Sequence, residues 1–272
     1  MPDYPHADLP LARRLERCEA ESNAAFVEAR ATLDPASGAG WMECNGTYAL
    51  FDGAGSPITQ TFGLGVFSVP TAADLELIEQ FFADRGAESF HEVSPLAAPE
   101  TLALLAARGY RPIELTSVLY RPIVPNDGSE GEVRTRIADP SEADLWAATA
   151  AEGWSEHPEV IDFVRDMGRV TAASRGSLPF FAELAGRPIG TGAVTIHEGV
   201  ALLAGASTIP SQRKRGAQRA LLEARLRHAA KQGCDLAMMG AQPGSASQRN
   251  AERQGFRVAY TRIKWGKQAP GA

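Results

Sequence analysis

Residues 207–222 read STIPSQRKRGAQRALL, and three local structures meet in this stretch. The apolar run from Val200 to Ala206 precedes it and predicts a buried strand. Pro210 cannot donate to a sheet ladder, so we expect it to end that strand. After Gly216 the apolar residues recur at helical spacing, in two rows that consist of Ala217, Leu221 and Ala224, and of Leu222, Leu226 and Ala229. The sequence therefore predicts a strand, a basic turn and a helix.

The turn between this strand and this helix is typical of an anion site. The first backbone N–H groups of a helix have no intrahelical partner, and the helix dipole is positive there. Together with the basic residues 213–215 they favour an anion, most simply a pyrophosphate. A solvated basic surface or a localisation signal would explain the charges, but it needs neither the buried strand nor the amphipathic helix. The spacing excludes a G-x-x-x-x-G-K-[ST] loop and a G-x-G-x-x-G loop.

The turn resembles the signature of the GNAT superfamily of acyl-CoA-dependent N-acyltransferases, [Q/R]-x-x-G-x-[G/A]. Arg213 and Gly216 match this pattern, whereas Gln218 stands where glycine or alanine is usual. A backbone N–H can serve at that position from any residue except proline. The resemblance implies an α/β fold with a central mixed, mostly antiparallel sheet flanked by helices. It also implies acetyl-CoA or another acyl-CoA as co-substrate, and no metal.

The same resemblance assigns residues to the co-substrate. The pantetheine arm would pair with the strand at Ser207, Thr208 and Ile209, where this strand splays from its neighbour. The pyrophosphate would lie on the turn and the first helical residues, namely Arg213, Lys214, Arg215, Gly216, Ala217, Gln218 and Arg219. Much of the catalysis would then be proximity, and a backbone N–H of the splayed strand would polarise the thioester carbonyl.

The acid that protonates the leaving thiolate is less defined by the sequence. Many family members carry a tyrosine four residues before a Gly-Phe pair, and here that position is Ala251. Ser247 and Asn250 are three residues apart on the predicted helix and share one face. We expect either to contact the pantetheine or the thiol, which makes Asn250 a catalytic candidate as well. The alternative is that both are ordinary exposed helix residues.

A general base is not found on the central strand, which has no carboxylate, and Glu198 in the turn before it is expected to face solvent. Residues 152–158, EGWSEHP, join two predicted helices that in this fold form a wall of the acceptor site. Glu152, Glu156 and His157 are candidates to deprotonate an ammonium directly or through water. Otherwise they are plain loop residues, and Trp154 lines the acceptor site or belongs to the core.

Composition limits the class of protein. The 272 residues suffice for two domains, and 44% hydrophobic with 22% charged residues is typical of a globular chain. A net charge of −6 argues against a nucleic-acid partner. The sequence has no apolar run long enough for a membrane span, and no signal-peptide pattern. The three cysteines have no metal-ligand spacing, so we expect a reduced, cytoplasmic setting; the oligomeric state is left open.

Periodicity and turn residues predict the remaining elements. Helices are expected at 7–33, 71–85, 99–108, 139–152, 160–174, 217–231 and 245–254. Strands are expected at 48–51, 58–69, 89–93, 110–120, 133–137, 178–184, 189–197, 200–206, 235–240 and 256–265.

The two halves of the chain repeat the same pattern. A helix, glycine, strand, helix and glycine-aromatic pair recur, with 23 positions from Gly86 to Gly109 and 22 from Gly233 to Gly255. The first half lacks a basic turn and carries Asp74 at the start of its helix. We therefore expect a degenerate GNAT-like domain at 1–121, a linker at 122–132 and an acyl-CoA-binding GNAT domain at 133–272. The alternative is two unrelated α/β segments that share common turns.

The predicted activity is transfer of an acetyl or other acyl group from acyl-CoA to a primary amine of a small molecule or a peptide. The alternative is a non-catalytic CoA-binding regulator. A nucleic-acid binder is disfavoured by the sequence pI of about 5.5.

Overall fold

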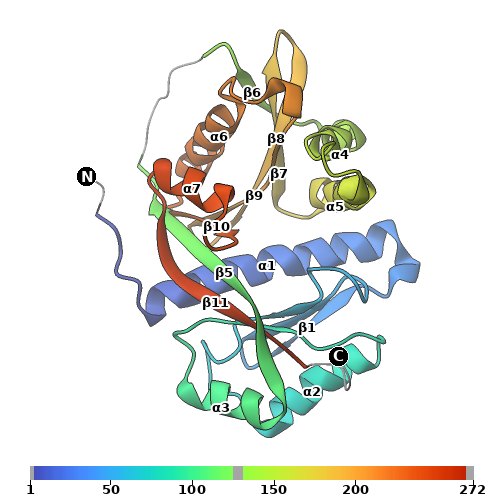
Figure 1. The fold of residues 1–272 in the computed structure, drawn as a ribbon, viewed down its shortest axis with the longest axis vertical. Coiled ribbons are helices and arrows are strands. Elements are labelled where there is room, and N and C mark those ends of the chain that lie inside the picture. The colour runs from blue at the N-terminus through green and yellow to red at the C-terminus, as the bar shows by residue number, and fades with distance from the viewer. Residues whose placement is uncertain (1–2, 125–130, 268–272) are drawn as a thin grey trace. The chain divides into compact units, whose positions relative to one another are not determined.

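The computed structural model describes residues 3–124 and 131–267, and the chain divides into two compact units (Figure 1). Unit 1 contains Asp3–Arg121 and the C-terminal part from Met238 onward, and unit 2 contains Pro122–Ala237. Of the expected linker at 122–132, residues 125–130 lie outside the described part of the chain. Both units consist of a sheet with helices packed on it.

In unit 2 the strands β9, β8, β7 and β6 pair antiparallel in this order, and the start of β10 is the other neighbour of β9. Its strands are β6 (Arg134–Ile137), β7 (Ser177–Leu184), β8 (Arg187–His197) and β9 (Val200–Thr208). Helix α6 (Ala217–Lys231) covers one face, and α4 (Ala143–Glu152) and α5 (Ile161–Ala173) cover the other (Figure 1). Three short 3-10 helices connect these elements: η2 (Pro140–Glu142), η3 (Pro158–Val160) and η4 (Pro210–Gln212). The boundary between the units falls inside β10 (Leu236–Ala241).

Trp146 is the centre of the core under α4. Its side chain is 1% exposed and packs with Phe181 and Ala193, and its indole Nε1 donates to the carbonyl of Phe180 at 3.0 Å. An aromatic side chain of this size contributes a large share of core burial, and its one polar atom is satisfied. The buried residues of α6 include both predicted rows except Leu226, and they also include Arg225.

Unit 1 has a sheet in the order β1-β2-β3-β4-β11-β5. All its pairings are antiparallel except β3 with β4, which run parallel with Thr61 opposite His91. Helix α1 lies on one face and α2 and α3 lie on the other (Figure 1). The elements are α1 (Leu9–Leu33), η1 (Pro35–Ser37), β1 (Gly40–Cys44), β2 (Thr47–Phe51), β3 (Gln60–Phe62), α2 (Ala72–Ala83), β4 (His91–Val93), α3 (Pro99–Ala107), β5 (Tyr110–Pro122), α7 (Ala246–Arg253) and β11 (Arg257–Lys267).

The C-terminal strand β11 is a central strand of unit 1. Ile263 lies opposite Val93 of β4 on one side and opposite Leu115 of β5 on the other. The expected domain at 133–272 therefore does not coincide with unit 2, because hydrogen bonds to both neighbours hold β11 in the sheet of the N-terminal residues. The proposed domain limits stay a prediction about the duplicated sequence.

A buried arginine connects β11 to α1 and β4. Arg262 is 2% exposed and lies 2.9 Å from Glu19, 3.3 Å from Glu92 and 3.5 Å from Glu16. Tyr260 donates to Glu16 at 2.9 Å. Burial raises the pKa of Glu92 to about 7. A buried guanidinium is tolerated only with opposite charges around it, so this cluster favours a single register of β11.

The fold class and most predicted elements are confirmed, with two differences. The strand expected at 58–69 is wrong, because only Gln60–Phe62 is strand. The chain turns at Gly63 with φ +80°, where a Cβ atom would lie 2.9 Å from the carbonyl oxygen of Gly46. Strand β1 was not expected, because its alternation of intermediate and exposed residues lacks a strongly apolar face.

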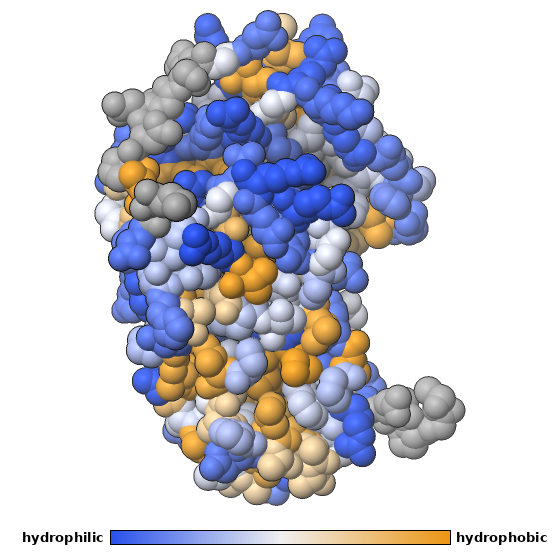
Figure 2. All heavy atoms as spheres, turned by 60° about the vertical axis from the view of Figure 1, so that its left-hand side comes forward, coloured by the Kyte–Doolittle hydropathy of each residue, from blue (hydrophilic) through white to orange (hydrophobic). Residues whose placement is uncertain are grey.

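The exposed apolar residues of unit 1 include several on its strands. Figure 2 shows apolar residues gathered over the lower part of the visible face. Ile113 and Leu115 of β5 and Val258 of β11 are exposed by 50%, 49% and 38%.

Among the described residues, no helix has the length and apolar character needed to cross a bilayer.

The pH dependence of stability tests the environment of His91. This side chain is fully buried, its Nδ1 lies 2.9 Å from Thr61 Oγ1, and burial lowers its pKa to about 3. The unfolded chain protonates near pH 6.5 and the folded chain does not, so the unfolded state binds more protons below pH 6.5. The contribution of the neutral His91 side chain to the free energy of unfolding is therefore complete above about pH 6.5. It is lost toward pH 3, by at most about 1.4 kcal/mol per pH unit.

We expect wild-type protein to lose free energy of unfolding between pH 6.5 and 4 more steeply than His91→Gln does, measured by urea denaturation. His6→Gln is the control, because His6 is exposed. Parallel pH curves for wild type and His91→Gln would contradict the buried neutral imidazole.

Candidate functional site

The turn after β9 combines two left-handed residues with an extended one. Arg213 is extended, with φ −62° and ψ 160°, Lys214 has φ +65° and Gly216 has φ +89°. Alternation of this kind directs successive backbone N–H groups into one concavity that favours anions. A Cβ atom built on Gly216 would meet nothing within 4 Å, so the space beside it is open. The sequence predicts the place of Gly216 in this turn, but it does not predict the left-handed conformation of Lys214.

Helix α6 begins without a cap. Gly216 occupies the N-cap position and provides no side-chain hydrogen bond to the first turn. Within the described part of the chain, the backbone N–H groups of residues 214–219 make no hydrogen bond. Six consecutive donors at the positive end of a helix dipole fit a pyrophosphate. Residues 213–216 are all exposed, so a ligand reaches them from solvent.

Helix α2 of unit 1, which corresponds to α6 in the predicted repeat, begins differently. Thr71 Oγ1 accepts the backbone N–H of Asp74 at 3.2 Å, and the Asp74 carboxylate accepts the backbone N–H of Thr71 at 2.8 Å. Hydrogen bonds from Thr71 hold the pKa of Asp74 below its usual value. The first turn of α2 is thus capped by the chain itself and carries a negative charge, which disfavours phosphate there.

The strand end assigned to pantetheine is tied closely into unit 2. Ser207 Oγ donates to the carbonyl of Ala150 at 2.8 Å, and the backbone N–H of Ile209 donates to Ile189 at 3.0 Å. Gln218 Nε2 donates to Thr208 Oγ1 at 2.7 Å. Gln218 stands where the family pattern has glycine or alanine, and its side chain therefore links α6 to the end of β9. The roles of Ser207, Thr208 and Ile209 toward a ligand stay predictions.

Arg213 connects the turn to the segment at 152–158. Its guanidinium pairs with the Glu156 carboxylate through Nη1 and donates to the carbonyl of Gly153 at 3.2 Å through Nη2. Arg219 pairs with Glu223 on its own helix at 2.8 Å. Lys214 and Arg215 are exposed on the turn. The structure therefore brings together one residue predicted for the pyrophosphate and one predicted as base.

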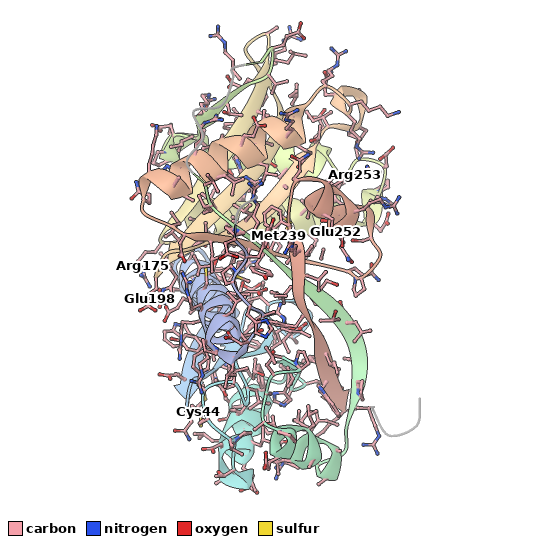
Figure 3. All side chains as sticks on the ribbon, turned by 90° about the vertical axis from the view of Figure 1, so that its left-hand side faces the viewer. Cys44, Arg175, Glu198, Met239, Glu252 and Arg253 are labelled. Carbon is pink, nitrogen blue, oxygen red and sulfur yellow. The ribbon has the colours of Figure 1, made fainter. Side chains whose placement is uncertain are left out.

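The remaining base candidates lie on an exposed loop. His157 is 61% exposed, its Nδ1 lies 3.6 Å from Glu159, and its ring centroid lies 6.3 Å from that of Trp154. Trp154 is 45% exposed and therefore does not belong to the core. Glu152 is exposed at the end of α4. Glu198, between β8 and β9, has a side chain 84% exposed at the surface, as expected (Figure 3).

Ser247 and Asn250 lie on α7, which belongs to unit 1, and both are exposed. Figure 3 shows Glu252 and Arg253 on the same helix. Ala251, at the position where a tyrosine is usual, is buried. The contacts expected of Ser247 and Asn250 stay predictions. Among the described residues, no group of three or more His, Cys, Asp or Glu side chains is arranged to hold a metal ion.

A feature that the sequence reasoning did not single out is a bulge in β9. Residues 204–206 are exposed, although the strand before them is buried. The pairing with β8 skips here, from Thr191 opposite Ser207 to Ala193 opposite Ala204. The signal available in the sequence is the run of small residues Ala-Gly-Ala-Ser at 204–207. Arg225 was also missed, although it stands four residues after Leu221 in a predicted apolar row.

The geometry agrees with comparison to known families. Residues 142–256 match the family model of the acetyltransferase (GNAT) family. This range includes α4, α5, β9, the basic turn, α6 and α7. The match over these residues confirms the resemblance inferred from the turn. No curated protein matches the chain in sequence.

Solved structures extend this likeness to both units. The chain is similar to a GCN5-related N-acetyltransferase from Kribbella flavida, with TM-score 0.65, 18% identity and 96% of each chain covered. A tandem GNAT protein from the clavulanic acid biosynthesis pathway gives TM-score 0.57, 15% identity, and covers 83% of this chain and 79% of its own.

A GCN5-related N-acetyltransferase from Sphaerobacter thermophilus gives TM-score 0.54 at 17% identity, with 78% of this chain and 73% of its own chain covered. At these identities the likeness shows the fold, a tandem GNAT-like arrangement. The family match supports acyl transfer from an acyl-CoA as the general class of reaction.

Replacement of Gly216 tests the turn. Gly216→Glu adds a side chain and a negative charge beside six free N–H groups, so acyl-CoA affinity should fall at least about tenfold. Isothermal titration calorimetry with acetyl-CoA measures it.

Gly233→Glu is the matched control, because Gly233 also has positive φ, +79°, and open space around its Cβ position. Both variants carry the same backbone strain, and only Gly216→Glu should lose affinity. Equal affinities in the two folded variants would refute the assignment of the turn.

Proposed function

We propose that the protein is an N-acyltransferase that moves an acetyl or other acyl group from acyl-CoA to a primary amine. The observation that carries this proposal is the start of α6, where the backbone N–H groups of residues 214–219 are free beside three basic side chains. A helix start that the chain leaves uncapped, next to an open space at Gly216, is built for an anionic ligand. The GNAT match supports the pyrophosphate of acyl-CoA as this anion.

The residues of the chain would bind and orient the substrates. The turn and the first residues of α6 hold the pyrophosphate, with Lys214 and Arg215 adding charge from the exposed side. The acyl-CoA supplies an activated carbonyl, whose C–S bond breaks as its carbon bonds to the amine nitrogen. The amine must lose a proton for this step, and the leaving thiolate must gain one. Glu156 and His157 are our candidates for taking the proton of the amine, and Asn250 is our candidate for a hydrogen bond to the thiol.

The acceptor would be a small-molecule or peptide amine. The loop at 153–157 presents Trp154, Glu156 and His157 to solvent, and together they offer an apolar surface with a carboxylate beside it. A carboxylate attracts the protonated amine, and the indole contacts an apolar or cationic part of the acceptor. The cysteines of the described residues form no disulfide, which agrees with the proposed cytoplasmic location.

A non-catalytic CoA-binding regulator is the second candidate function. Two observations favour it, because Glu156 is engaged by Arg213 and a buried alanine stands where family members carry the acidic tyrosine. The decisive experiment is thiol release from acetyl-CoA in the presence of a panel of primary amines. Amine-dependent release supports the transferase, whereas binding without release supports the regulator.

Substitution of Glu156 distinguishes two roles for this residue, a general base or a restraint on Arg213. If Glu156 is the base, Glu156→Gln should lower kcat on the order of 10²-fold and leave acyl-CoA affinity nearly unchanged. His157→Gln is the parallel variant, and the pH–rate profile should change in the variant that lacks the base. If Glu156 only restrains Arg213, the substitution should change acyl-CoA affinity and not the pH profile. Wild-type activity at all pH values in both variants would remove these residues from the mechanism.

The number of acyl-CoA molecules per chain tests the asymmetry of the repeat. Helix α6 starts with free donors, whereas α2 starts with a complete Thr71–Asp74 capping box. We therefore expect one acetyl-CoA per full-length chain in a calorimetric titration, and weaker binding at that single site in Gly216→Glu. Two equivalent sites per chain would overturn the degenerate-repeat interpretation.

A further inference from the structure

Arg225 is a buried arginine without an acidic partner. It lies on α6, is 3% exposed, and forms no ion pair within the described part of the chain. Burial lowers the pKa of its guanidinium to about 10, which leaves it charged at neutral pH. Burial of a charge without an opposite charge costs free energy of folding. We expect such a side chain where its hydrogen bonds hold backbone groups that an apolar side chain would leave without a partner.

The hydrogen bonds of Arg225 go to backbone carbonyls at the β9 bulge. Nη1 donates to Ala204 of β9 at 3.3 Å and to Ala193 of β8 at 3.1 Å, and Nε donates to Leu221 of its own helix at 3.1 Å. Thr191 Oγ1 donates to the next bulge carbonyl, that of Gly205, at 3.2 Å. Two consecutive carbonyls of the bulge are therefore held by side chains of unit 2.

These contacts fix the direction of two backbone donors. All described peptide bonds are trans, so the C=O and N–H of one peptide unit point in opposite directions. The carbonyl of Ala204 faces Arg225, and the N–H of Gly205 in the same peptide unit therefore points away from it. By the same argument, the N–H of Ala206 points away from Thr191. Both donors belong to the exposed stretch at 204–206.

The bulge is enclosed tightly on both faces of the sheet. A Cβ atom on Gly192 of β8 would lie 2.9 Å from Arg225 Cζ, so the guanidinium lies directly against the strand. On the other face, a Cβ atom on Gly205, which has φ +61°, would lie 3.0 Å from the indole of Trp146. Arg225 from α6 and Trp146 from α4 thus leave the bulge little freedom to change its shape.

We propose that Arg225 is a positioning residue that holds the β9 bulge, so that the N–H groups of Gly205 and Ala206 are presented at its exposed side to the thioester carbonyl of the acyl donor. This inference rests on the proposed function for its chemistry. Preorganised backbone donors stabilise the negative charge that develops on a reacting carbonyl oxygen. The buried positive charge directly behind the bulge acts in the same direction, since little solvent screens it.

Arginine is required here for a geometric reason. Its planar fork donates from Nη1 to carbonyls on two adjacent strands and from Nε to its own helix at the same time. A lysine would keep the charge but bring a single nitrogen. It would also titrate at a lowered pH in this buried position. A methionine would fill a similar volume and leave the two strand carbonyls without a donor.

The test compares Arg225→Met and Arg225→Lys with Leu222→Ala, a control on the same helix. Leu222 is 6% exposed, and its truncation destabilises α6 without removing a hydrogen bond from β9. In Arg225→Met we expect kcat for acyl transfer to fall on the order of 10²-fold, with KM for acetyl-CoA nearly unchanged. Arg225→Lys should recover part of kcat and lose it at a lower pH than wild type does, because burial also lowers the pKa of a lysine. Leu222→Ala should keep the wild-type kcat below its melting temperature.

Amide hydrogen exchange of residues 200–208 provides a readout that is independent of activity. Exchange in this segment should be about tenfold faster or more in Arg225→Met, because a charged hydrogen bond to the bulge is lost, and near wild type in Leu222→Ala. Unchanged exchange overturns the proposal. An equal loss of kcat in Leu222→Ala, or wild-type kcat in folded Arg225→Met, also overturns it. Absence of thiol release by wild type with every amine refutes the proposed function, and the exchange experiment still decides whether Arg225 holds the bulge.

Discussion

The segment from β9 to α6 depends on one constraint, namely that backbone N–H groups must find partners or remain open to solvent. In most of the chain the sheets and helices satisfy this requirement internally. At residues 214–219 the chain leaves consecutive donors free, at the surface and at the positive end of a helix. At the β9 bulge, Arg225 and Thr191 donate to two backbone carbonyls, and the N–H groups of the same two peptide units point away from these side chains. Both sets of donors lie on one continuous stretch, and the rest of unit 2 supports that stretch.

The support comes from both faces of the sheet. On one face, Arg225 of α6 approaches so closely that a Cβ atom at position 192 would displace its guanidinium. On the other face, Trp146 of α4 packs against Gly205, and Ser207 donates to the carbonyl of Ala150. A bulge in a sheet is otherwise free to shift its register, which would rotate its donors. Polar contacts to backbone carbonyls remove this freedom, since each fixes the plane of one peptide group.

The two helix starts of the repeat show how small a change decides whether an anion can be bound. Thr71 and Asp74 satisfy each other at the start of α2, and the carboxylate opposes any further negative charge. Gly216 offers no side chain at the start of α6, so the donors there remain available. In unit 1, buried polar groups instead connect parts of the fold. Arg262 of β11 forms ion pairs with Glu16 and Glu19 of α1, and also with Glu92 of β4.

The sequence by itself determined most of the elements, the turn and the family resemblance. Periodicity in α6, Pro210 after the strand and Gly216 before the helix are local signals, because they depend on residues within one or two turns of each other. Tertiary structure alone decided the rest. Arg225 lies one helical turn after Leu221, and only packing against β8 and β9 shows that its donors reach two strand carbonyls. The pairing of Arg213 with Glu156 joins residues 57 positions apart. The place of β11 between β4 and β5 rests on hydrogen bonds to strands more than 130 positions away, which no local pattern encodes.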